Sequence, residues 1–76
     1  MDEPLHVLIK NAIEIAWEYL ERTGELESPE VASRVLLHSV ELMVRQGVRS
    51  RLLLSNRSIM AYQKFQQERA RHLIPV

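Results

Sequence analysis

The stretch that most constrains how this chain can fold is residues 28–47, SPEVASRVLLHSVELMVRQG. Placed on a helix at about 100° per residue, it leaves one narrow polar seam. That seam consists of Arg34, His38, Glu41 and Arg45. Apolar side chains cover well over half of the circumference, which is typical of a helix buried on several sides. We therefore expect the rest of the chain to cover this helix.

The ends of this central helix carry residues that favour helix termini. Ser28 can accept a hydrogen bond from an N–H group of the first turn, and Pro29 suits the first helical position. Gly47 follows the last apolar residue of the pattern and is typical of a C-terminal cap. These signals predict a helix over residues 29–46.

The preceding residues predict an amphipathic helix over residues 4–23. An acidic residue, Asp2 or Glu3, stands before Pro4, a combination typical of a helix start. Apolar side chains then recur on one face as far as Leu20, and Gly24 ends the pattern. Because the loop that follows is short, the first two helices are expected to be antiparallel neighbours.

The residues after Gly47 predict a third helix, over residues 49–72. They include strong helix formers, but their apolar side chains do not gather on one face. Leu53 and Met60 lie nearly opposite the main apolar arc, so this helix needs contacts on two sides. In an alternative interpretation, Ser55 and Asn56 cap a new helix and break the segment in two.

Together these patterns predict an all-α fold. The chain is expected to form one three-helix domain over residues 1–76, with antiparallel neighbouring helices and the central helix 29–46 largely buried. A domain of 76 residues buries only roughly 60–65% of the surface that its unfolded chain exposes. The sequence has no cysteine, which excludes disulfides and most structural zinc sites. Self-association is the remaining means of stabilisation, and we expect a homodimer.

Apolar residues in excess of what one domain can bury provide the candidate dimer interface. The third helix contributes Leu53 and Met60, which face away from its main apolar arc. The central helix contributes Leu37 and Val44, because its polar seam is so narrow. We predict that these four residues contribute to the interface.

Charge is divided unequally along the chain. Residues 1–44 hold nine acids and three bases, a net charge of −6, whereas residues 45–76 hold seven bases and one acid, a net charge of +6. The two halves can be solvated faces of one bundle, complementary surfaces of a dimer, or a basic binding surface beside an acidic half. The candidate basic surface consists of Arg49, Arg51, Arg57, Lys64 and Arg71.

The basic half also bears on DNA recognition. With Gly47 at a turn, Val48 follows it directly, Ser50 can cap the next helix, and Leu53 takes a buried position of that helix. In these residues the segment resembles helix-turn-helix proteins. The sequence departs from their pattern at Met43, Gln46 and Asn56. The resemblance implies a dimeric nucleic-acid-binding regulator that uses the basic segment 45–72.

The sequence contains no pattern that favours an enzyme. His6, His38 and His72 are scattered, and no spacing places two metal ligands on one helix face. Glu14 and Glu18 are at helical spacing but lack the Glu-x-x-His partners of a four-helix di-iron site. We predict no catalytic residue, no metal, no cofactor and no small-molecule substrate.

The remaining features favour a cytoplasmic interaction protein. No uncharged run exceeds six residues, which argues against a membrane span, and the N-terminus lacks the basic start of a secretory signal. We predict a small interaction or regulatory module that acts as a homodimer and binds another protein, whose identity the sequence leaves unknown. The dimeric nucleic-acid-binding regulator is the alternative.

Overall fold

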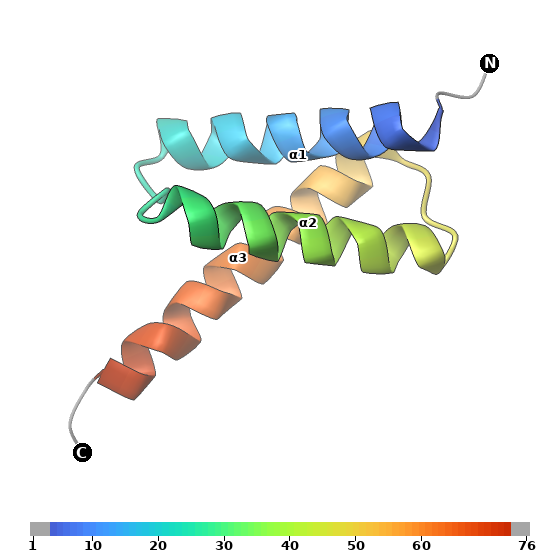
Figure 1. The fold of residues 1–76 in the computed structure, drawn as a ribbon. Coiled ribbons are helices and arrows are strands. Elements are labelled where there is room, and N and C mark those ends of the chain that lie inside the picture. Colours follow the sequence, from blue (N-terminus) through green and yellow to red (C-terminus); the bar gives the residue numbers. More distant parts are fainter. Residues whose placement is uncertain (1–3, 74–76) are drawn as a thin grey trace.

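The computed structural model describes residues 4–73, with side chains as far as Ala70, and shows three helices. They are α1 (Leu5–Arg22), α2 (Pro29–Arg45) and α3 (Arg51–Leu73). No residue within 4–73 belongs to a strand. Helices α1 and α2 lie side by side and antiparallel, and α3 crosses behind both (Figure 1). The prediction of an all-α, three-helix fold is confirmed.

The starts of α1 and α2 differ in how their free N–H groups are satisfied. At α1 the carbonyl of Pro4 accepts from the N–H groups of Val7 and Leu8, both at 3.0 Å, and no side chain caps the helix. Pro4 is therefore the N-cap residue, one position before the first residue of α1. Asp2 and Glu3, which were predicted to mark this helix start, lie outside the described residues. At α2 the hydroxyl of Ser28 accepts from the N–H of Val31 at 3.5 Å, as predicted.

Both glycines end a helix in the left-handed region of backbone space. Gly24 has φ +73° and Gly47 has φ +97°. After α1, the N–H of Glu25 donates to the carbonyl of Leu20 at 2.9 Å; after α2, the N–H of Val48 donates to the carbonyl of Met43 at 3.0 Å. These bonds close Schellman-type caps, which require a residue that tolerates positive φ. The chain therefore turns where the sequence predicted.

Helix α3 begins at Arg51, two residues later than predicted, because the hydroxyl of Ser50 accepts from the N–H of Leu53 at 3.2 Å and caps it. It then continues without a break to Leu73. The Ser55 hydroxyl does not start a new helix; it donates to the carbonyl of Leu52 at 3.0 Å, within the same helix. Of the two interpretations of this segment, the single long helix is confirmed.

The core consists of two clusters of buried residues, arranged along the α1–α2 pair. The first joins the start of α1 to the end of α2 and to α3, and contains Leu8, Ala12, Val40, Met43, Val44 and Leu54. The second joins the end of α1 to the start of α2 and to α3, and contains Ala16, Leu20, Ala32, Leu36, Ile59 and Tyr62. Helix α3 contributes to both clusters, so it holds the other two helices together.

Small side chains line the crossing of α3 over the other helices. Ser55 and Ser58 of α3 are fully buried, as are Ala12, Ala16 and Ala32 of α1 and α2. The Ser58 hydroxyl donates to the carbonyl of Ser55 at 2.8 Å, so its burial leaves no hydrogen-bonding group unsatisfied. Residues of this size let helix backbones approach closely, which fixes where α3 crosses.

Helix α2 is covered over a narrower face than its apolar pattern predicted. Ala32, Leu36, Val40, Met43 and Val44 are buried, but Leu37 and Leu42 remain 41% and 42% exposed. The reason lies in the architecture, because three helices can cover only the side of α2 that faces α1 and α3. Two large apolar side chains of the central helix are therefore left at the surface.

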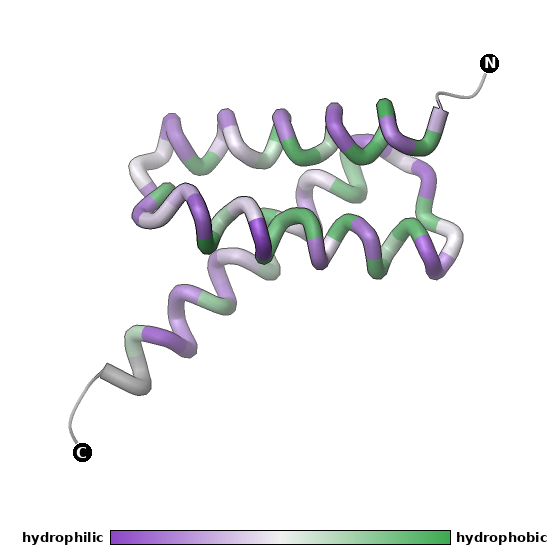
Figure 2. Tube along the Cα trace, in the orientation of Figure 1, coloured by the Kyte–Doolittle hydropathy of each residue, from purple (hydrophilic) through white to green (hydrophobic). Residues whose placement is uncertain are grey.

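The C-terminal part of α3 extends beyond the α1–α2 pair (Figure 1). Figure 2 shows this part as largely hydrophilic, whereas the first half of the helix mixes hydrophobic and hydrophilic residues. The molecule is accordingly elongated, with principal extents of 52 × 25 × 17 Å. As for membranes, none of the three described helices combines the length and the apolar character that spanning one requires.

Candidate interaction surface

The two most exposed large apolar side chains of the described residues lie on α3: Leu52 is 66% exposed and Met60 65%. Leu53 of the same helix is 37% exposed. Leu53 and Met60 are seven residues apart, so they share one face of the helix, about half a turn from the buried Ser58 and Tyr62. We call Leu53 and Met60 the α3 outer ridge. Since the opposite face of α3 packs on both α1 and α2, this ridge faces away from the rest of the domain.

The other two residues of the predicted interface do not join the outer ridge. Val44 is only 7% exposed and packs with Leu8 and Leu54 inside the first core cluster, so it offers little surface to a partner. Leu37 is exposed, but it belongs to α2, from which the outer ridge points away. The structure thus brings together Leu53 and Met60 alone.

The predicted basic residues occupy different environments. Arg57 and Lys64 are exposed on α3, beside the outer ridge, and seven residues separate them, which is about two helical turns. The guanidinium of Arg49 instead donates to the carbonyls of Val44 and Val48, at 2.8 and 3.0 Å, and so stabilises the end of α2. Arg51 is exposed in the first turn of α3, and the side chain of Arg71 lies outside the described part. The four of these residues whose side chains are described therefore do not form one uniform basic patch.

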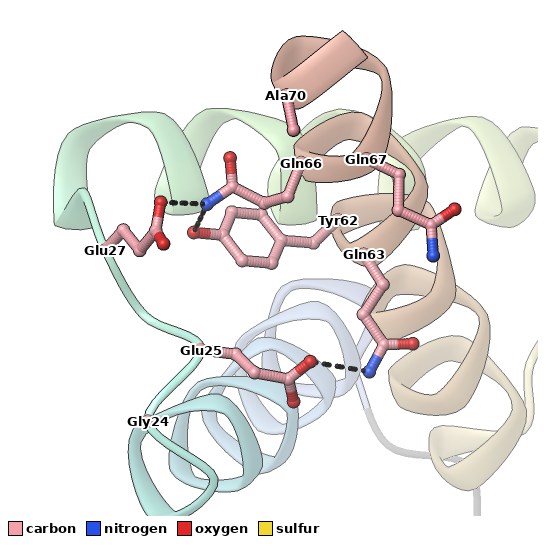
Figure 3. Close-up of a pocket in the computed structure, with 8 residues that line it drawn as sticks. All are labelled: Gly24, Glu25, Glu27, Tyr62, Gln63, Gln66, Gln67 and Ala70. Carbon is pink, nitrogen blue, oxygen red and sulfur yellow. Dashed lines mark hydrogen bonds between the residues drawn. The ribbon is translucent and has the colours of Figure 1, made fainter. Parts of the chain in front are cut away.

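The acidic loop between α1 and α2 is hydrogen-bonded to glutamine side chains of α3. The amide of Gln63 donates to the carboxylate of Glu25, and that of Gln66 to the carboxylate of Glu27, both at 3.1 Å (Figure 3). The Gln66 amide also lies 2.9 Å from the hydroxyl of Tyr62. These bonds hold the loop 23–28 against α3.

A pocket of about 560 Å³ opens at this junction, between the loop and α3 (Figure 3). Its carboxylate from Glu25 already accepts from both Gln63 and the Thr23 hydroxyl, the latter at 2.6 Å. Its other carboxylate, from Glu27, accepts from Gln66. Because the acids are engaged by side chains of the same molecule, we interpret these contacts as structural.

A second, more apolar concavity of about 510 Å³ lies between α2 and the second half of α3. Val35 and Leu42 line it from α2, and Ala61 and Phe65 from α3. We call it the α2–α3 groove. The sequence alone does not show that Leu42 and Phe65 are exposed, because their exposure depends on the angle at which α3 crosses α2.

The described residues contain no group of three or more His, Cys, Asp or Glu side chains placed to hold a metal ion. His6 and His38 are exposed and lie on different helices, and the side chain of His72 is outside the described part. Glu14 forms an exposed ion pair with Lys10 at 3.9 Å.

The fold and its surfaces define a small three-helix domain whose third helix crosses an antiparallel pair and presents an apolar ridge to solvent. No protein-family model, no curated protein and no solved structure matches this chain. Its surfaces are therefore the basis for inferring a function.

Proposed function

We propose that the protein is a macromolecular interaction module that acts as a homodimer through the outer ridge of α3. The proposal rests on the exposure of Leu53 and Met60, on a face of α3 that the other described residues do not cover. Contiguous apolar side chains on a surface helix are typical of protein interfaces, because covering them removes apolar area from water.

The spacing of the ridge suits a twofold axis. If two copies of α3 pack antiparallel, Leu53 of one copy lies opposite Met60 of the other, and the axis passes between Asn56 and Arg57. Asn56 then faces Arg57 of the second copy, where its amide oxygen can accept from the guanidinium. One small, self-complementary patch thereby covers the apolar side chains of both copies.

Replacing both ridge residues with charge tests the proposal. We expect the protein to sediment as a concentration-dependent dimer and the variant Leu53→Glu with Met60→Glu to sediment as a monomer, since buried carboxylates would face one another. Circular dichroism must show that the variant remains helical. The matched control is Leu37→Glu, a similarly exposed leucine on α2, which should leave the dimer intact.

A compact monomer at high micromolar concentration would refute the homodimer. If the variant Leu53→Glu with Met60→Glu remained dimeric, the dimer interface would lie outside the outer ridge.

The alternative function, a nucleic-acid-binding regulator, has one observation in its favour. Arg57 and Lys64 are exposed on the same side of a helix that follows a turn at Gly47 and is capped by Ser50. Against it, apolar side chains stand beside these cations, where DNA would present phosphates, and Arg49 is occupied at the end of α2. The interaction module therefore remains our first proposal.

A further inference from the structure

The α2–α3 groove is a second surface, distinct from the outer ridge, that the described residues leave open. Helices α2 and α3 diverge from their crossing (Figure 1). The groove is lined by α2 and by the second half of α3. Its floor is apolar, and the two largest side chains on it, Leu42 and Phe65, are 42% and 37% exposed. Such a concavity between two helices is the kind of surface on which a third helix packs.

The size of the groove also suits a helix. Its α2 side runs from Arg34 to Leu42, which is about 12 Å, or roughly two helical turns. An amphipathic helix lying along it would place apolar side chains three, four and seven residues apart against Leu42 and Phe65.

The charges on the walls define the partner further. Arg34 stands on the α2 wall and Lys64 on the α3 wall, and neither side chain has a hydrogen bond or ion pair with any residue described in the structure. The groove lining contains a single carboxylate, from Glu68, which lies one turn beyond Lys64 on α3. Each wall therefore presents one cation without a side-chain partner, and the lining has one more cation than carboxylate.

We infer that the α2–α3 groove binds an amphipathic helix of another protein in which carboxylates flank the apolar stripe. The apolar stripe covers Leu42 and Phe65, and the flanking carboxylates meet Arg34 on one wall and Lys64 on the other. This inference goes beyond the self-association proposed above, because it uses different apolar side chains, Leu42 and Phe65, and a different kind of partner.

A display library tests the inference while the partner is still unidentified. The library contains helical peptides of about 14 residues, roughly four turns, with leucine fixed along one stripe. The flanking positions vary among Glu, Lys, Gln and Ser. We expect selection on the full-length protein at about 0.15 M salt to enrich glutamate at the flanks.

Charge reversal of the walls gives the decisive comparison. The variant Arg34→Glu with Lys64→Glu should weaken the selected peptides roughly tenfold and, in a fresh selection, should enrich lysine instead. The matched control is Lys10→Glu with Arg22→Glu, which changes net charge equally on α1 and should alter the affinity by less than about twofold. All variants are checked for helicity by circular dichroism.

Three results would overturn the inference. If the selected peptides showed no preference for glutamate at the flanking positions, the charges of the groove walls would not select the partner. If the affinity of the selected peptides did not change in the Arg34→Glu with Lys64→Glu variant, the peptides would bind outside the groove. If the variant Phe65→Glu no longer self-associated, the groove would be part of the contact between two copies of this chain. Repeating the selection on Leu53→Glu with Met60→Glu separates the two proposals, because that variant should keep its peptide specificity.

Discussion

At the scale of single residues, stability depends on a few fully buried side chains. Leu36 is fully buried in the second core cluster, whereas Leu37, its neighbour in sequence, is 41% exposed. Adjacent leucines of one helix thus contribute very differently. Helical geometry causes the difference, because consecutive side chains point about 100° apart.

Truncation of these two leucines measures that contrast. We expect Leu36→Ala to lower the free energy of unfolding by about 2–5 kcal/mol, since it removes buried methyl groups and leaves a cavity. Leu37→Ala is the matched control and should cost less than about 1 kcal/mol. Chemical denaturation followed by circular dichroism gives both values. Similar losses for the two variants would mean that α2 is buried on another face.

The glycine caps give a second prediction at this scale. An added Cβ at Gly47 would meet no atom within 4 Å, so the cost of a substitution there is conformational and not steric. We expect Gly47→Ala to destabilise the domain by about 1–2 kcal/mol, because alanine disfavours positive φ. Asparagine tolerates this region better, so Gly47→Asn should cost less. An alanine variant as stable as the parent would show that the turn can adopt another conformation.

At the scale of elements, α3 organises the domain more than α2 does. It supplies residues to both core clusters, and the loop 23–28 is hydrogen-bonded to it through Gln63 and Gln66. Its hydroxyl-bearing residues Ser55 and Ser58 lie at the crossing, where larger side chains would separate the helices. The position of α3 is therefore set by small residues as much as by large apolar ones.

Enlarging one of these residues tests the crossing. We expect Ser58→Leu to destabilise the domain by about 1–3 kcal/mol through overpacking, even though leucine is more apolar and a better helix former. Gln67→Leu, at an exposed position of the same helix, should change stability by less than about 0.5 kcal/mol. Thermal unfolding provides the measurement, and a Ser58→Leu variant that gains stability would contradict the close approach.

At the scale of the whole molecule, the charge division does not produce a dense network of ion pairs. Loop carboxylates of the acidic half bond to glutamines of α3, and Arg57 and Lys64 bond to none of the described side chains. Lys64, which the proposed dimer contact does not use, remains available to a further partner. The remaining question is whether that partner is a protein or a nucleic acid.

Salt dependence distinguishes the two. A nucleic-acid binder that neutralises several phosphates loses affinity by orders of magnitude between about 50 and 200 mM salt. We expect no appreciable binding to mixed-sequence duplex or single strands at physiological salt, because the acidic half of the same small molecule repels phosphates. Titration of labelled DNA and RNA at both salt concentrations provides the measurement. Sub-micromolar binding at the higher salt, abolished by Arg57→Glu with Lys64→Glu, would favour the alternative function.

The sequence by itself determined the helices and most of their ends. Ser28, Gly24 and Gly47 act through hydrogen bonds and backbone angles within a few residues, so their effects can be inferred without knowing the fold. The apolar spacing likewise identified Leu53 and Met60 as residues that α3 cannot bury together with its main face. Local interactions were sufficient for these predictions.

Only the tertiary structure decided which apolar residues are covered and which are left exposed. The pattern of α2 could not show that Val44 is buried while Leu37 and Leu42 stay at the surface, nor that Arg49 is held at the end of α2. The α2–α3 groove depends on the angle of the α3 crossing, and that angle follows from how buried serines and alanines of three helices fit together. Packing between segments distant in sequence sets that fit, and the periodicity of one helix contains no information about it.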